Sequence, residues 1–91
     1  MKTNQIGKTK LTRDVELTFI YDQEEKEWLV ELEEGQLYEY GIGNTKEEAL
    51  IDLGECLLGT LEFYPGSSHP EGFTKDAIEL GDFIKELIEC Q

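Results

Sequence analysis

Apolar residues recur at every second position in three runs along the first half of the chain. Such alternation puts apolar side chains on one face of a strand and polar ones on the other, which is typical of a half-buried β-strand. Polar residues such as Glu16 and Glu31 fill the intervening positions. The apolar positions are Leu11, Val15, Leu17, Phe19 and Tyr21 in the first run, Trp28, Val30 and Leu32 in the second, and Tyr38, Tyr40 and Ile42 in the third.

Short polar segments separate the three runs and predict how the strands pair. Residues 22–26 read Asp-Gln-Glu-Glu-Lys, and Glu34-Gly35 precedes the third run. Strands joined by so few residues pair as hairpins. We therefore predict a three-stranded antiparallel meander over about residues 14–42. The apolar residues that fall out of phase, and so are predicted to point to the opposite face, are Ile20, Leu29 and Leu37.

The strands are rich in aromatic residues, which allow two interpretations. Aromatic side chains are favoured in strands because they pack well against cross-strand neighbours. The same residues would also suit a platform for a ligand. The aromatic positions concerned are Phe19, Tyr21, Trp28, Tyr38 and Tyr40.

A helix is predicted directly after the third strand. Thr45-Lys46-Glu47-Glu48 has the Thr-x-x-Glu pattern of a capping box, in which two side chains satisfy the first free amides of a helix. Apolar residues then recur at spacings of three and four, which indicates a helix over about 45–63 with one face on the sheet. These residues are Ala49, Leu50, Leu53, Leu57, Leu61 and Tyr64. Residues 59–64 also alternate, so a fourth, edge strand there is the alternative.

Two glycines interrupt the predicted helix. Gly54 and Gly59 each lower helix propensity by roughly 1 kcal/mol relative to alanine. We interpret them as positions where the helix lies close to the sheet or bends.

A second helix is predicted at the C-terminal end. Residues 65–72 read Pro-Gly-Ser-Ser-His-Pro-Glu-Gly and break regular structure, after which Thr74 caps a helix from about residue 74. Its apolar positions form a wide stripe that packs either on its own sheet or on a second copy of the chain, and closed two-fold dimers are the commonest oligomers. The residues predicted to mediate self-association as a homodimer are Leu80, Phe83, Ile84 and Leu87.

Length and composition limit the domain organisation. Ninety-one residues suffice for one domain. Residues 1–10 are polar and basic without periodicity, and are predicted to form a flexible tail. Residues 11–91 are then a single α+β domain. No apolar run has the length of a signal peptide or of a membrane span, so a cytoplasmic location is expected.

Charge is distributed unevenly along the chain. The formal net charge is −13. Four of the eight cations lie before Asp14, which is the first acidic residue. From Asp14 onward there are 21 acids against four lysines, a net charge of −17. Such a body repels nucleic acid and attracts a basic protein partner, or the acids serve solubility alone. The candidate partner-binding residues are Glu24, Glu25, Glu27, Glu31, Glu33 and Glu34.

Catalytic and cofactor chemistry are not expected. The single histidine, His69, lies in a predicted loop beside Ser67 and Ser68 without an orienting partner. Two cysteines, Cys56 and Cys90, with one histidine do not supply a zinc site, and we expect both thiols to be reduced. Gly41-Ile42-Gly43 lacks the third glycine of a dinucleotide-binding motif, which would fall at residue 46. No catalytic residue, metal or cofactor is therefore predicted.

The order of elements, with Gly-Asn-Thr-Lys-Glu-Glu-Ala-Leu at residues 43–50 opening the helix, resembles the HicB antitoxin family and its partial RNase H-like relatives. The resemblance covers residues 14–64. It implies a non-enzymatic antitoxin-type domain that covers a small basic RNA-cleaving toxin.

Two features depart from the family pattern. The family carries a proline-containing loop before the third strand, whereas residues 33–37 have no proline, and its DNA-binding domain has no counterpart here, so operator binding is not expected. The alternatives are a nucleic-acid mimic from a mobile element that inhibits a host nuclease, or an orphan domain without a toxin partner.

Overall fold

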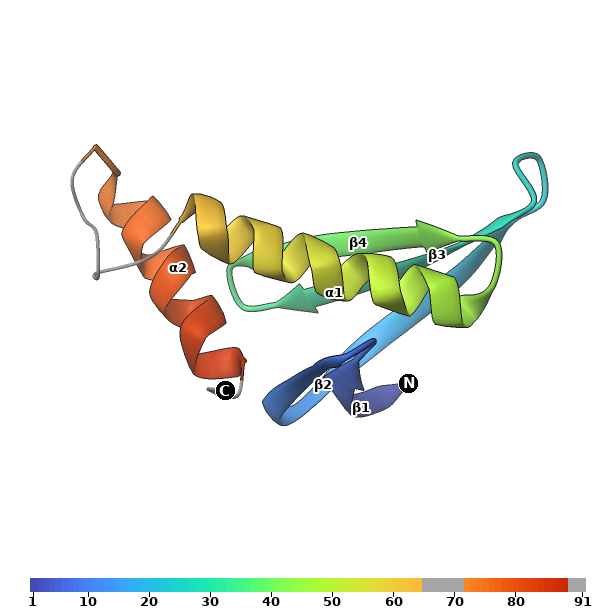
Figure 1. The fold of residues 1–91 in the computed structure, drawn as a ribbon, viewed down its shortest axis with the longest axis horizontal. Coiled ribbons are helices and arrows are strands. Elements are labelled where there is room, and N and C mark those ends of the chain that lie inside the picture. Colours follow the sequence, from blue (N-terminus) through green and yellow to red (C-terminus); the bar gives the residue numbers. More distant parts are fainter. Residues whose placement is uncertain (65–71, 89–91) are drawn as a thin grey trace.

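The computed structural model describes residues 1–64 and 72–88, which form a sheet and two helices. The elements in chain order are β1 (Lys2–Ile6), β2 (Thr9–Asp22), β3 (Glu27–Glu34), β4 (Leu37–Gly43), α1 (Lys46–Phe63) and α2 (Lys75–Leu87). Every strand pairs antiparallel with its neighbour in sequence, in the order β1-β2-β3-β4 (Figure 1). The predicted α+β class and antiparallel meander are confirmed, with one strand more than the three predicted.

The additional strand is β1, so the prediction of a flexible tail over residues 1–10 is wrong. Gly7, with φ +59°, turns the chain back so that β1 pairs with the first half of β2. Ile6 is fully buried, and the backbone amide of Leu17 donates to the carbonyl of Met1 at 2.8 Å. The segment is therefore held by pairing and by one apolar anchor, although its own sequence has no strand periodicity.

The alternative of an edge strand over residues 59–64 is also wrong, because α1 continues to Phe63. Its start is the predicted capping box. The Thr45 hydroxyl accepts from the Glu48 amide at 3.1 Å, and Glu48 Oε2 accepts from the amide of Asn44 at 2.9 Å. At the other end, the Tyr64 amide donates to the Thr60 carbonyl and closes the last turn.

Helix α2 begins after Thr74, as predicted, and packs on its own chain. The Thr74 hydroxyl accepts from the Ala77 amide at 3.2 Å. At the other end, the Thr12 hydroxyl donates to the Glu86 carbonyl at 2.8 Å, and Ile88 forms an isolated bridge with Leu11. The part of β2 before residue 17 does not pair with β3. Helix α2 packs beside this part of β2 and closes the core there.

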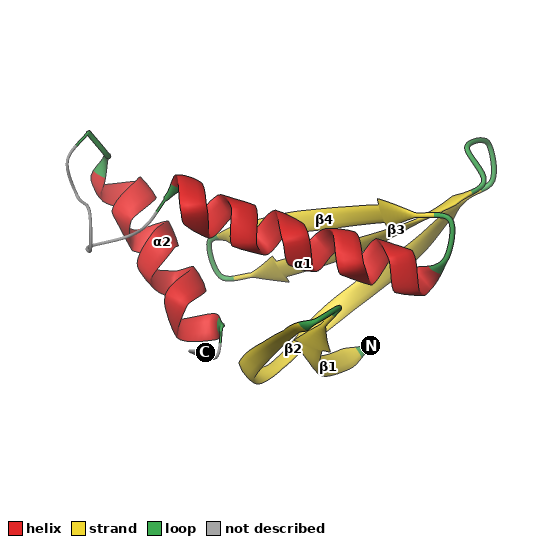
Figure 2. Cartoon of the chain, in the orientation of Figure 1, coloured by secondary structure: helices red, strands yellow, loops and turns green. Residues whose placement is uncertain are grey.

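Both helices cover the same face of the sheet (Figure 2), and a single core lies between the helices and the sheet. The buried apolar residues come from all four strands and both helices. They are Ile6, Leu11, Val15, Leu17, Val30, Leu32, Leu37, Ala49, Leu53, Leu57, Ile84 and Leu87. Leu37 is among them, so the prediction that it points away from the core is wrong.

Two glycines of β4 set how closely α1 approaches the sheet. A Cβ atom added to Gly41 would lie 2.9 Å from Leu53 Cα and in contact with the Ala49 carbonyl, and one added to Gly43 would lie 2.5 Å from the Ala49 nitrogen. No side chain fits there, so β4 turns its glycines toward α1. The larger residues next to these glycines, Tyr40 and Ile42, consequently lie on the other face.

The glycines of α1 differ from one another. Gly54 lies against β1, since an added Cβ would be 2.9 Å from the Ile6 carbonyl oxygen, whereas an added Cβ at Gly59 would meet no atom within 4 Å. The interpretation of close approach is thus confirmed for Gly54, whereas at Gly59 there is no close approach and a bend stays the interpretation. In the described part of the chain, neither helix is long and apolar enough to cross a membrane.

Candidate protein-binding surface

One face of the sheet carries no helix, and we call it the open face. Cross-strand neighbours define its rows: Ile20, Leu29 and Ile42 form an apolar row, and Thr18, Glu31 and Tyr40 form the next. Beyond them, Glu33 lies opposite Tyr38. Four large side chains of this face are exposed, with values of 44% for Ile20, 40% for Ile42, 49% for Tyr40 and 53% for Tyr38, whereas Leu29 is half-buried.

The open face confirms two predicted positions and corrects one strand. Ile20 and Leu29 point away from the core, as predicted. In β4, however, Tyr38, Tyr40 and Ile42 were predicted on the core side and lie on the open face. The physical reason is that Gly41 and Gly43 contact α1. The residues that alternate with them therefore point away from the helix, opposite to the prediction.

A shallow hollow of about 480 Å³ lies at the end of the open face next to the β2–β3 turn. Its apolar part is the row Ile20, Leu29 and Ile42, and its rim is acidic. The lining residues are Ile20, Tyr21, Asp22, Gln23, Glu24, Glu27, Leu29 and Ile42. The hollow thus combines an apolar floor with carboxylates around it.

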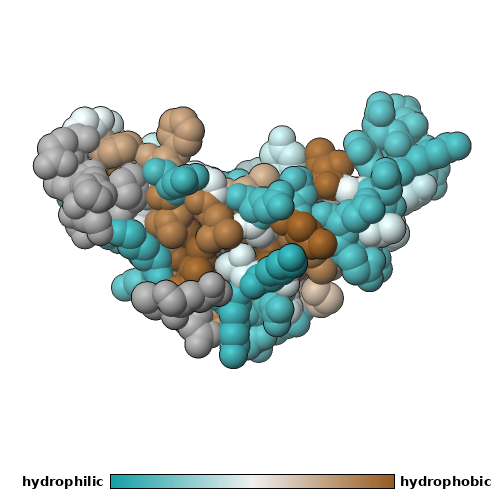
Figure 3. All heavy atoms as spheres, viewed as in Figure 1, coloured by the Kyte–Doolittle hydropathy of each residue, from teal (hydrophilic) through white to brown (hydrophobic). Residues whose placement is uncertain are grey.

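The β2–β3 turn holds the rim in place. Asp22 Oδ1 accepts from the amides of Glu24 and Glu25 at 3.0 and 3.2 Å, and Lys26 takes the left-handed backbone conformation with φ 55°. This turn projects past the start of α1 (Figure 1), and it is hydrophilic in Figure 3, where apolar surface gathers between α1 and α2. The acidic rim therefore stands clear of the helices.

Two tyrosines on the open face, Tyr38 and Tyr40, lie beside the Glu31 carboxylate. The Tyr38 hydroxyl donates to Glu31 Oε2 at 2.6 Å, and the rings of Tyr38 and Tyr40 lie 6.3 Å apart with a tilt of 40°. The hydrogen bond to Glu31 and, to a smaller extent, desolvation and neighbouring negative charge raise the pKa of Tyr38 above its ordinary value of 10.0. Glu31 is thereby held beside both rings.

Negative charge dominates the open face. Its strand positions include Glu16, Asp22, Glu27, Glu31 and Glu33, and its lysines lie at the β1 edge, where Lys2 is the cross-strand neighbour of Glu16. The amino terminus of Met1 lies 3.4 Å from Glu16 at the far edge. Over β3, β4 and the part of β2 paired with β3, the face therefore presents carboxylates and apolar groups together, without lysine or arginine at its strand positions.

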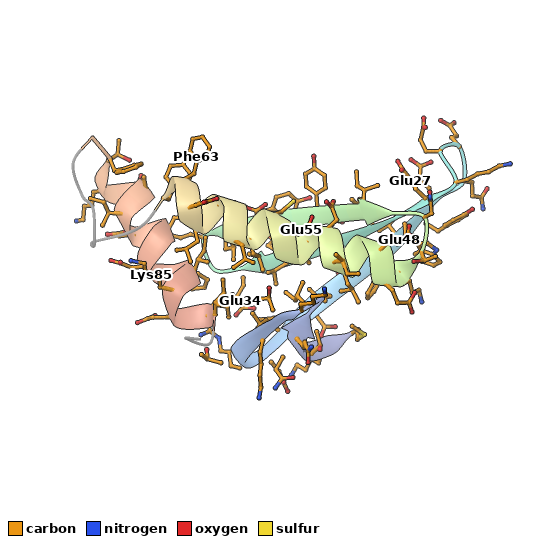
Figure 4. The ribbon with its side chains drawn as sticks, viewed as in Figure 1. Glu27, Glu34, Glu48, Glu55, Phe63 and Lys85 are labelled. Atoms are coloured by element: carbon orange, nitrogen blue, oxygen red, sulfur yellow. The ribbon has the colours of Figure 1, made fainter. Side chains whose placement is uncertain are left out.

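The six predicted partner-binding residues fall into two places. Glu27, Glu31 and Glu33 lie on the open face, and Glu24 and Glu25 lie in the adjoining turn. Glu34 shares the covered face with its cross-strand neighbour Leu37, so it does not belong to this group. Figure 4 shows Glu27 and Glu34 at opposite ends of β3.

Glu34 takes part in a separate contact near α2. Arg13 Nη2 lies 3.8 Å from Glu34 Oε1, and the Arg13 guanidinium lies 5.6 Å from the centre of the Phe83 ring. Arg13 thus bridges β3 and α2.

The four residues predicted to mediate self-association mostly belong to the chain's own core. Ile84 and Leu87 are fully buried, and Leu80 and Phe83 are half-buried against the core cluster. Helix α2 does not cover Ile20 or Leu29, because it lies on the opposite side of the sheet. Self-association through α2 stays a prediction, with only the outer parts of Leu80 and Phe83 accessible for it.

The other aromatic residues of β2 and β3, Phe19, Tyr21 and Trp28, pack around the start of α1. The sequence did not reveal this contact. Lys46 Nζ lies 4.8 Å from the centre of the Trp28 ring and 5.4 Å from that of Phe19, while Tyr21 packs on Trp28 at 5.1 Å. Such cation–π contacts contribute roughly 0.5–1 kcal/mol at exposed sites. No spacing rule links a lysine in a capping box to rings on two strands.

The predicted loop with Ser67, Ser68 and His69 and the second cysteine, Cys90, lie outside the described residues. Cys56 is half-buried, and burial, followed by the charges of Asp52, Glu39 and Glu55, raises the pKa of its thiol. Among residues 1–64 and 72–88, histidine, cysteine and acidic side chains do not come together in groups of three that suit a metal ion.

Comparison of the chain with protein-family models, with curated proteins and with solved structures found no match. An assignment of function therefore rests on the chain's own residues.

Proposed function

We propose that the protein is a non-enzymatic binding protein that engages a basic protein partner through its open face. The observation that carries the proposal is the apolar row of exposed Ile20 and Ile42 with half-buried Leu29 between them, which lies among carboxylates without a helix to cover it. Exposed apolar rows rimmed by charge are typical of interaction surfaces.

Charge and apolar surface have separate roles in this proposal. The acids around the row attract a basic partner over about a Debye length, or about 8–10 Å at physiological salt, and accelerate encounter. Burial of the row then supplies affinity that salt does not screen. Binding is therefore expected to weaken with salt without disappearing at once.

A second copy of the chain is a poor occupant of the same face. Two open faces in contact would bring Glu27, Glu31 and Glu33 of each copy together, and like charges so placed cost free energy. The proposal therefore commits to a partner with basic residues around an apolar contact.

The kind of partner is proposed from the resemblance to the HicB antitoxin family. An antitoxin-type domain of that family would cover a small basic RNA-cleaving toxin. The antiparallel strands and the capping box at Thr45 are consistent with the resemblance over residues 14–64, while β1 and α2 lie outside that range.

The experiment is capture of partners from lysate at low and high salt with the wild-type protein and two charge variants. Glu31→Lys/Glu33→Lys changes the open face, and Glu55→Lys/Glu62→Lys makes the same charge change on exposed positions of α1. We expect a basic protein that is retained by the wild type and the α1 variant and lost by the open-face variant. Equal loss in both variants, or capture of acidic proteins only, would contradict the proposal.

The identity of the captured protein separates the two kinds of partner. A small RNA-cleaving protein encoded beside this gene would support the antitoxin-type role. A host nuclease whose activity falls on binding would instead indicate the nucleic-acid mimic, although it would occupy the same acidic face.

A further inference from the structure

We infer that the open face recognises arginine rather than lysine, and that the bound segment of the partner places arginine side chains on Tyr38 and Tyr40 next to its apolar contact. This inference rests on the proposed function. It concerns the part of the open face beside the apolar row.

Aromatic rings and carboxylates alternate in this part of the face. Tyr40 lies opposite Glu31 and Tyr38 lies opposite Glu33 across the β3–β4 pair. About half of each tyrosine side chain is exposed, at 49% and 53%. A cation placed over either ring would therefore lie within reach of a neighbouring carboxylate.

The hydrogen bond between Tyr38 and Glu31 fixes one of these carboxylates. Because Tyr38 donates to Oε2, the Glu31 side chain is oriented before any partner arrives. A carboxylate accepts about four hydrogen bonds in total. Glu31 can therefore accept further hydrogen bonds from a partner. Because its side chain is already oriented, binding costs it little additional conformational entropy.

The combination suits a guanidinium group better than an ammonium group. A guanidinium is planar, stacks on aromatic faces and donates to a carboxylate through two parallel N–H groups. The lysine ammonium is a compact and strongly hydrated charge, and it loses more hydration on a partly exposed ring. The ring–carboxylate geometry thus distinguishes two cations that the net charge alone does not.

The apolar row fixes where the arginines stand on the partner. Tyr40 is two residues from Ile42 along β4, and Glu31 is two residues from Leu29 along β3. Two residues of a strand span about 6.8 Å. The partner segment is therefore amphipathic, with an apolar side chain for the row and an arginine about that distance away, as on one flank of a helix at positions i and i+4.

The chain itself does not supply such a segment. Its only arginine is Arg13, which contacts Glu34 and the Phe83 ring near α2. The occupant is accordingly a different protein rather than a second copy.

The test uses the full-length protein and two amphipathic helical peptides that are identical except for arginine or lysine at the same four positions. Calorimetric titration of the wild-type protein is expected to give at least about fivefold tighter binding of the arginine peptide. Tyr40→Leu keeps an apolar side chain but removes the ring, and should reduce the ratio of the two dissociation constants to within about twofold. Phe63→Leu changes an exposed aromatic residue at the end of α1, on the opposite side of the sheet, and should leave the ratio unchanged.

The outcomes separate this inference from the proposed function. Equal binding of both peptides, lost in Glu31→Lys/Glu33→Lys, overturns the inference and leaves the proposed function in place. A preference that survives Tyr40→Leu also overturns it. Failure of both peptides to bind overturns it together with the proposed role of the face. If Tyr40→Leu does not retain the wild-type circular dichroism spectrum, Tyr38→Leu provides the same comparison.

Discussion

The two faces of the sheet are built from the same strands, yet one is covered and the other is open. In β2 and β3 the larger apolar residues turn toward the helices, as Leu17 and Leu32 do. In β4 only Leu37 does so, because Gly41 and Gly43 face α1 while Tyr38 and Tyr40 face away. A strand therefore need not turn its larger apolar residues inward: in β4, the space required by the helix backbone determines which side is covered.

The largest expected difference between the faces is in the free energy of unfolding. Leu32→Ala removes a fully buried side chain and should cost about 2–5 kcal/mol, whereas Ile20→Ala, on the open face, should cost about 1 kcal/mol or less. Urea denaturation followed by circular dichroism measures both. Similar losses in the two variants would mean that the open face is covered in solution, and dependence of the Ile20→Ala loss on protein concentration would identify self-association as the cause.

A smaller effect is expected where α1 rests on the glycines of β4. Gly41→Ala places a methyl group against the backbone of Ala49 and Leu53, and overpacking of this kind should destabilise the protein by about 3 kcal/mol. Gly59→Ala is the matched control, since it adds the same methyl group in open space within a helix and should stabilise by up to about 1 kcal/mol. Equal stability of the two variants would show that α1 shifts freely over β4.

The smallest effect concerns the ionisation of Tyr38 on the open face. Its pKa is raised mainly by the hydrogen bond to Glu31, so the neutral phenol is favoured in the folded state. The resulting stabilisation is present below pH 10.0, the ordinary tyrosine pKa, and is lost as the pH rises through the raised value. Ultraviolet titration of tyrosine should show that Glu31→Gln lowers this pKa and that Tyr38→Phe removes the transition.

Glu33→Gln serves as the control for that titration. Glu33 acts on Tyr38 only through its charge, as the weakest of the causes, so its replacement should move the pKa less than Glu31→Gln does. An equal shift in both variants would mean that charge, rather than the hydrogen bond, controls Tyr38.

Local patterns were sufficient to predict much of the fold. The alternation in β2 and β3, the two threonine N-caps and the periodic stripe of α1 depend on residues close in sequence, and each appears in the structure. Alternation gives the period of a strand but not which side is covered. Tyr38 and Leu37 were therefore placed on the wrong sides of β4, since the contact of Gly41 with α1 could not be read from the strand itself.

Pairing and cross-strand contacts account for the other errors. Residues 2–6 form a strand because β2 provides a partner and Ile6 an anchor, although the segment is polar. Five of the six acidic candidates lie on the open face or in the adjoining turn, as alternation predicts. Glu34 departs because its neighbour is the buried Leu37.

The contact of α2 with β2 has a consequence for local unfolding. All strand pairings join neighbours in sequence, but α2 and the residue after it contact β2 across 74 residues or more, as Thr12 and Glu86 do, so these contacts close the longest loop in the described part of the chain. We expect α2 to detach as a unit before the sheet opens, and its amides to exchange with solvent deuterium sooner than those of β3. The strands that carry the open face keep their hydrogen bonds in that partly unfolded state, so it retains the surface proposed for binding.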